Sequence, residues 1–131
     1  MREPDIERDG WCLESGEAYD AAAPDTFPIP TVKERLNLQI GDFAKLIFRI
    51  HVEDVDDPFP AERMWVIVSD IRQDGYTGIL DNDPDAVAEN DLFWSGIELP
   101  FEACHVIQIM PGDENSKAIV ADGPKRRWPR D

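Results

Sequence analysis

Alternating apolar and polar positions mark five short strands along the middle of the chain. The clearest stretch is DFAKLIFRIHV, in which every second residue from Ala44 to Val52 is apolar. This period of two is typical of a strand with one buried face. The same reasoning, applied along the chain, predicts strands near residues 43–52, 63–71, 75–81, 95–99 and 105–110.

Helix and turn signals separate these strands. Thr31 is followed three residues later by Glu34, the spacing of a capping box, so a short helix is expected near 31–38. Asp74-Gly75 lies between two strands and predicts a hairpin, because glycine accepts a positive φ. The stretch PFEAC, before the last strand, has the length of a single helical turn.

Short strands, an early hairpin and a helical turn before the last strand predict a mainly β fold. We expect a small, strongly bent, five-stranded SH3-like barrel with a short N-terminal helix, and an OB-like barrel is the alternative. Barrel closure removes exposed strand edges, which otherwise invite aggregation. The expected core is apolar and comprises Leu46, Phe48, Ile50, Val66, Val68, Ile79, Leu99, Val106 and Ile107.

The residues before and after the predicted strands show no regular pattern of apolar positions. Residues 1–30 are rich in acids and proline and predict an extended N-terminal arm. Residues 31–110 form the expected single barrel domain with its leading helix. Residues 111–131 lack periodicity and predict a flexible C-terminal tail.

The charge restricts the class of partner. The 131 residues carry a formal net charge of −15, and residues 43–110 alone contain 14 acids and 4 bases. A body this negative repels phosphate backbones, so nucleic acid is not an expected partner. No apolar run approaches the roughly 18 residues that cross a bilayer, so a membrane is not expected either. Basic proteins or peptides fit the charge, because opposite charges accelerate encounter. The alternative is that the acidic surface only keeps the protein in solution.

Two cysteines and an acidic, polar N-terminus indicate a cytoplasmic protein. Cys12 and Cys104 lie in unlike contexts, which is not the pattern of a disulfide scaffold. The opening MREPDIERDG lacks the apolar core of a signal peptide.

Three stretches resemble a bacterial domain family of unknown function: ERMWVIVSDI, DGYTGILDNDP and GIELPFEACHVIQI. Its members carry a Met-Trp-Val strand followed by a Gly-x-Leu-Asp-Asn-Asp-Pro-like segment. The resemblance runs from about Pro24 to Ile109, is tightest over Arg63–Pro84, and departs at the inserted DAVAENDLFW. It implies no reaction or cofactor. Some relatives occur near toxin–immunity systems.

The stretch GILDNDPD allows two interpretations. Asp81, Asp83 and Asp85 occupy the first, third and fifth positions of a calcium-loop pattern. That pattern also requires glycine at the sixth position and glutamate at the twelfth, where this chain has Ala86 and Leu92. Asn, Asp and Pro favour turns for reasons of backbone chemistry. We therefore expect a turn without a bound metal.

No catalytic motif emerges from the sequence. Cys104 and His105 are adjacent, and on a strand their side chains would point to opposite faces, so we expect a core cysteine rather than a nucleophile with its base. No phosphate-binding glycine loop and no serine-centred elbow is present. We therefore expect no enzyme and no cofactor. The alternative is a hydrolase or metal-dependent enzyme that uses the acidic loop 81–91.

Aromatic residues beside acids give the most specific functional hypothesis. Such pairs suit a cationic peptide or a basic protein through cation–π and charge attraction. For Trp65 and Tyr76, packing in the core is the open alternative. We expect a protein- or peptide-binding module, with an immunity-like inhibitor of a basic toxin as its sharpest form. The candidate partner surface comprises Trp65, Tyr76, Asp81, Asn82, Asp83, Phe93 and Trp94.

Overall fold

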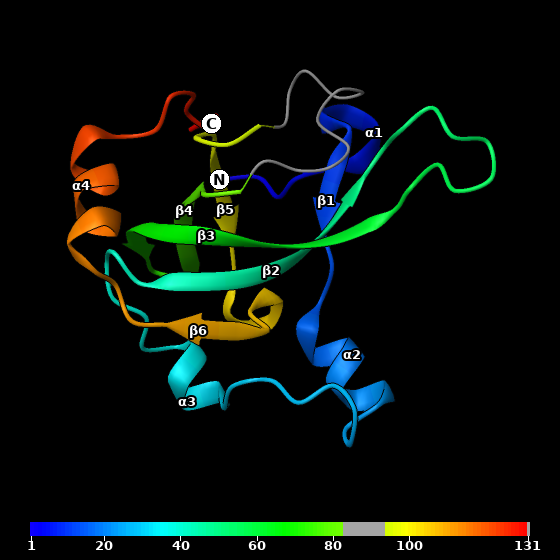
Figure 1. The fold of residues 1–131 in the computed structure, drawn as a ribbon, viewed down its shortest axis with the longest axis horizontal. Helices are drawn as coiled ribbons and strands as arrows, with labels where there is room; N and C mark the ends of the chain where they lie inside the picture. Colours follow the sequence, from blue (N-terminus) through cyan, green and yellow to red (C-terminus); the bar gives the residue numbers. More distant parts are fainter. Residues whose placement is uncertain (83–93, 131) are drawn as a thin grey trace.

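One curled antiparallel sheet forms the body of the protein in a computed structural model that describes residues 1–82 and 94–130. The long strands β2 (Phe43–Ile50) and β3 (Ala61–Arg72) run beside β4 (Gly75–Leu80) and β5 (Glu98–Phe101). The sheet curls into a half-barrel (Figure 1). The prediction of a small, strongly bent, mainly β fold is confirmed.

Two short strands complete the sheet by pairing with different halves of β2. β6 (Gln108–Met110) pairs with its first residues, and β1 (Trp11–Leu13) pairs with its last residues. Strands β2 to β6 correspond to the five predicted strands. β1 lies in the segment that was expected to be an extended arm, and its three residues are too few to show a period.

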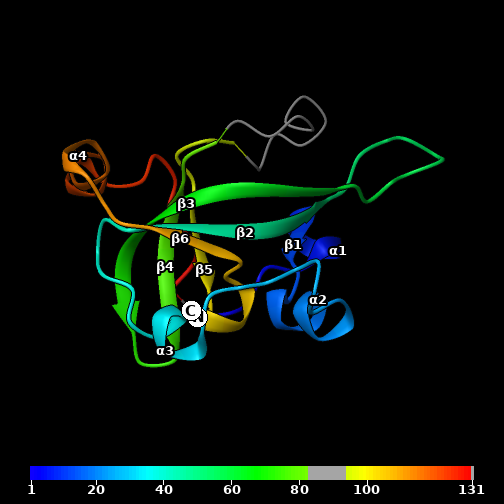
Figure 2. The same cartoon turned by 60° about the horizontal axis from the view of Figure 1, so that its bottom comes forward.

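Short helices surround the sheet. α1 (Ile6–Asp9) precedes β1, while α2 (Gly16–Ala22) and α3 (Val32–Arg35) lie together at one end of the molecule (Figures 1 and 2). The predicted capping box is present at α3, where the Glu34 N–H donates to the Thr31 hydroxyl. The 3₁₀ turn η2 (Ala103–His105) is the helical turn predicted before the last strand. No helix in the described ranges has the length and apolarity to cross a membrane.

All nine predicted core residues are buried. Most of them belong to one cluster inside the curl of the sheet, which includes Leu46, Phe48 and Val66. Ile79 is buried on the opposite face of the sheet, where it pairs directly with buried Ile67. The centre of the sheet is therefore covered on both faces.

The predicted hairpin exists, but the reason for its glycine differs. β3 and β4 are joined by two residues, and Arg72 pairs with Gly75. Among the glycines, positive φ angles occur at Gly10, Gly41, Gly96 and Gly123, and not at Gly75. A Cβ at Gly75 would lie 2.7 Å from the carbonyl oxygen of Phe101. Gly75 is therefore required by close strand packing rather than by a left-handed turn.

Both ends of the chain are folded onto the sheet, which for residues 111–131 differs from the expected flexible tail. Trp11 of β1 is 1% exposed, and Trp128 near the C-terminus is 7% exposed. The Trp128 indole N–H donates to the carbonyl oxygen of Arg2 over 3.0 Å, so the two ends of the chain meet. Between β6 and Trp128, the chain forms helix α4 (Glu114–Asp122). The flexible tail was mispredicted because its anchor is a long-range contact.

Candidate functional site

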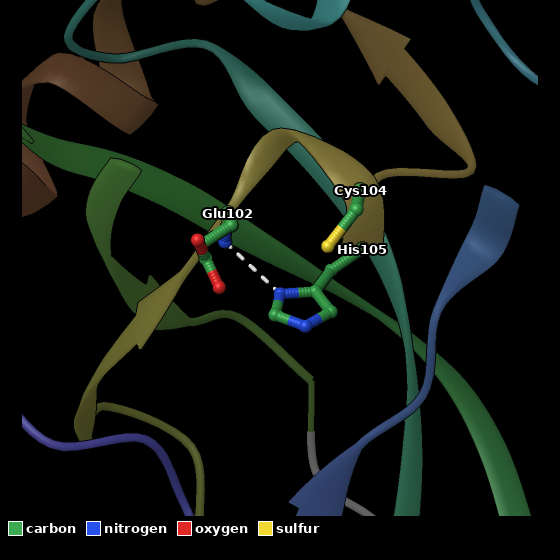
Figure 3. Close-up of side chains that lie close together, drawn as sticks. All are labelled: Glu102, Cys104 and His105. Carbon is green, nitrogen blue, oxygen red and sulfur yellow. Dashed lines mark hydrogen bonds between the residues drawn. The ribbon is translucent and has the colours of Figure 1, made fainter. Parts of the chain in front are cut away.

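The turn η2 gathers three chemically interesting side chains. One ligand atom each from Glu102, Cys104 and His105 lies within 4.8 Å of the others, and all three residues are half-buried (Figure 3). On a strand, Cys104 and His105 would point to opposite faces. The 3₁₀ turn instead places their side chains near one another, so this part of the sequence argument was wrong.

The hydrogen bonding of His105 works against metal binding. The backbone N–H of Glu102 donates to His105 Nδ1 over 3.0 Å, which occupies the lone pair of that nitrogen (Figure 3). Burial lowers the pKa of His105, and this outweighs the opposing effect of Glu3 and Glu17. The neutral ring therefore carries its proton on Nε2. Neither nitrogen offers a free lone pair until that hydrogen bond breaks.

The neighbouring thiol is poorly suited to nucleophilic chemistry. Burial raises the pKa of Cys104, and the negative charges of Glu102, Glu17 and Glu3 raise it further. The thiolate is both the nucleophile and the metal-binding form of cysteine. A neutral His105 supplies no positive charge to stabilise that thiolate. In this geometry His105 does not activate the thiol, and its hydrogen bond with the Glu102 N–H closes the turn that leads from β5 to β6.

A second feature of the molecule is the acidic loop, residues 51–60, which joins β2 to β3 and projects from the body (Figures 1 and 2). Four of its ten residues are carboxylates: Glu53, Asp54, Asp56 and Asp57. Within this run, Val55 is 93% exposed and Phe59 is 43% exposed. The loop thus presents apolar side chains inside a strongly negative segment.

The base of the acidic loop is fixed to the sheet. The Val52 N–H donates to the Pro58 carbonyl over 2.9 Å, and the Arg49 guanidinium donates to the Phe59 carbonyl over 2.8 Å. The ring of Phe59 lies 5.3 Å from that of His51. These contacts hold the two arms of the loop together and leave Val55 at its exposed turn.

Tyr76 does not belong to a partner surface. Its side chain is 4% exposed and stacks on Phe101 at a centroid distance of 5.3 Å. Its hydroxyl donates to the Arg35 carbonyl over 2.8 Å and accepts from the Leu38 N–H over 3.3 Å. The alternative left open by the sequence, core packing, is the observed one.

Three other residues of the predicted surface are brought together. The Trp65 N–H donates to Asn82 Oδ1 over 2.6 Å, and the Asp81 N–H donates to the Trp65 carbonyl over 3.0 Å. Burial, together with the nearby charge of Asp113, raises the pKa of Asp81. The Asn82 side chain continues the backbone pairing of β3 after β4 ends, which is a structural task typical of a turn residue.

The remaining predicted residues lie near or within the segment that the structure leaves undescribed. Trp94 is half-buried and packs against the core cluster. Asp83 and Phe93 lie outside the described residues, as does most of the 81–91 loop of the enzyme hypothesis. Among the described residues, the predicted surface therefore consists of Trp65, Asp81, Asn82 and the exposed part of Trp94.

A hollow of about 310 Å³ opens between α3, the end of β3 and η2. Leu36, Ile71 and Cys104 contribute to its walls. The charged groups at its rim include Arg72 and Asp74, which pair with each other over 3.2 Å. A catalytic pocket requires polar groups that converge on a substrate. The walls of this hollow are mainly apolar, and its polar lining includes Gln73 and Glu102 besides the Arg72–Asp74 pair.

The sequence analysis did not identify the exposed apolar residues of the acidic loop as a candidate binding surface. The available signal was Val55 itself, an apolar residue flanked on both sides by acids in a segment without alternation. An apolar residue in such a segment does not belong to the buried face of a strand, so its side chain is expected to be exposed.

Comparisons of the chain with protein-family models, with curated proteins and with solved structures found no match. The resemblance over Pro24 to Ile109 therefore stays a prediction, and the functional argument depends on the geometry.

Proposed function

We propose that the protein is a non-enzymatic module that binds a basic protein or peptide through the acidic loop. The main support is the exposure of Val55. Its side chain is 93% exposed at the turn of a loop that contains four carboxylates and projects from the barrel. The fold does not need this side chain, since Val55 lies outside the core cluster. A partner with a small apolar depression and a basic rim is complementary to it.

In this proposal the negative charge affects the association rate, and apolar burial affects the dissociation rate. The negative loop on a chain of net charge −15 attracts a cationic partner from a distance and accelerates encounter. Burial of a valine side chain in the complex contributes about 1.5–3 kcal/mol, which slows dissociation. The pinned base of the loop reduces the ordering entropy that binding would otherwise cost.

The sharpest form of the proposal is an immunity-like inhibitor of a basic toxin. It rests on the family resemblance together with the charge of the loop. An inhibitor of this kind needs a rigid body that presents a preformed surface, and a small barrel with a projecting loop is suitable for that.

The test is affinity capture of partners from bacterial lysate by the intact chain and by three variants. Asp56→Asn with Asp57→Asn removes charge from the loop, and Val55→Ser removes its apolar turn residue. Asp25→Asn with Asp122→Asn makes the same charge change at exposed positions elsewhere. We expect a basic protein that the wild type and the control retain and that both loop variants lose. Equal retention by all four proteins, or retention of acidic proteins only, would contradict the proposal.

A further inference from the structure

Two basic side chains lie close together on the outer face of the sheet. Lys45 of β2 pairs directly with Trp65 of β3 and, on its other side, with Gln108 of β6. Arg63 is two residues from Trp65 along β3, so it projects from the same face. Lys45 and Arg63 are therefore diagonal neighbours in a sheet whose residues 43–110 carry far more acids than bases.

An aromatic ring holds each of these cations in place. Lys45 Nζ lies 5.4 Å from the centroid of the Trp65 ring, and the Arg63 guanidinium lies 4.8 Å from that of Phe27. The Phe27 ring is itself 5.2 Å from Tyr19, so Arg63 is the outer member of a stack of three side chains. Cation–π contacts orient a positive group but do not neutralise its charge.

Neither cation has a carboxylate partner within residues 1–82 and 94–130. This differs from five arginines of the same part of the chain, which form ion pairs with nearby acids. Those paired residues are Arg2, Arg35, Arg49, Arg72 and Arg130.

The two cations line a groove of about 150 Å³ between the sheet and the segment that follows α2. The groove offers hydrogen-bond donors from Lys45, Arg63, Gln108 and Thr26. None of its described lining residues carries a carboxylate; the others are Phe27, Pro28 and Ile107. Two like charges beside each other repel, and an anion between them removes that repulsion.

We propose that this groove binds one compact oxyanion, a phosphate or carboxylate group. The planar guanidinium of Arg63 matches two oxygens of such a group, and the Lys45 ammonium adds a point charge. The volume fits a single group, and the negative body of the protein repels polyanions. The site is separate from the acidic loop, so the two proposals succeed or fail independently.

The experiment is a titration of the ¹⁵N-labelled full chain followed by backbone amide shifts at pH 7. Three sodium salts are added at matched ionic strength: phosphate, acetate and chloride. We expect saturable shifts centred on Lys45, Arg63 and Gln108 with phosphate, with acetate or with both, and no saturable shift with chloride. A response to phosphate alone assigns the site to phosphoryl groups, and a response to acetate alone assigns it to carboxylates.

Two variants make the assignment specific. Lys45→Met with Arg63→Met keeps the alkyl packing on the rings and should weaken binding at least about tenfold. The matched control, Lys33→Met with Lys117→Met, removes two exposed charges elsewhere and should bind like the wild type. Amide spectra in the absence of salt report whether each variant is folded. The proposal is overturned if no oxyanion shifts these amides, if chloride shifts them equally, or if the folded double variant binds as well as the control.

Discussion

At the residue scale, the tertiary partners of a side chain decide its role. Trp65 and Tyr76 are both aromatic and both lie on strands, and the sequence treats them alike. In the structure, Tyr76 bonds through its hydroxyl to Arg35 and Leu38, which are 41 and 38 positions away in sequence. Such contacts leave no local pattern, so the sequence could not separate a core tyrosine from a surface one.

Tyr76→Phe should destabilise the protein. The change removes a buried hydroxyl and leaves the Arg35 carbonyl and the Leu38 N–H without this partner, at a cost of about 1–3 kcal/mol. Urea denaturation followed by tryptophan fluorescence measures the loss. Tyr19→Phe is the matched control, because the Tyr19 hydroxyl bonds to Glu14 in a more exposed setting and should matter less. An equal loss in both variants would contradict the structural role of Tyr76.

At the element scale, prediction succeeded where the signal was local. The alternation of β2 and the capping box of α3 depend on residues only two or three positions apart. Both elements occur where the sequence predicts them. β1 was missed because it depends on β2 for its hydrogen bonds. α4 was missed although Asp113 and Ser116 form a capping box at its start. Residues 111–131 show no hydrophobic period, and the prediction of a flexible tail used that criterion alone.

The attachment of the C-terminal segment to β5 also follows from long-range pairing. Glu98 is 6% exposed and accepts two hydrogen bonds from the Arg130 guanidinium, at 2.6 and 2.9 Å, and one from the Trp128 N–H. Burial alone would raise the pKa of Glu98, but these hydrogen bonds and the nearby positive charges outweigh it and lower the pKa. The ionised carboxylate is therefore the form that holds the segment in place.

Glu98→Gln should lower stability at pH 7 by about 1–3 kcal/mol, because hydrogen bonds to a charged group are replaced by weaker ones. A carboxyl whose folded pKa is depressed stabilises the fold above its unfolded pKa, and this contribution disappears as pH falls through the folded pKa. The wild type should therefore lose stability on acidification below about pH 4.5 more steeply than the variant. Urea denaturation at pH 7, 5, 4 and 3 measures both effects.

The control for this prediction is Glu114→Gln, which changes an exposed acid at the start of α4. It should leave the acid dependence as steep as in the wild type. Parallel pH profiles for the wild type and Glu98→Gln would show that the Glu98–Arg130 pair does not secure the C-terminal segment.

At the scale of the whole molecule, the fold class follows from the alternation and turn signals of the sequence, and the net charge follows from its composition. The sequence did not predict how the charge is arranged. The acidic loop and the groove of Lys45 and Arg63 lie at different places on one sheet, and only the register of β2 and β3 reveals the groove. A net charge of −15 therefore coexists with a local anion-binding geometry.

The central claim is that the acidic loop captures a basic partner by electrostatic steering. Its most direct test is the association rate of the captured partner, measured by stopped-flow fluorescence as ionic strength rises. The Debye length shrinks from about 10 Å at 0.1 M to about 3 Å at 1 M, so steered association slows steeply with added salt. Asp56→Asn with Asp57→Asn should slow association, flatten this dependence and leave the dissociation rate nearly unchanged. An association rate that is independent of salt, and equal in wild type and variant, would contradict the account.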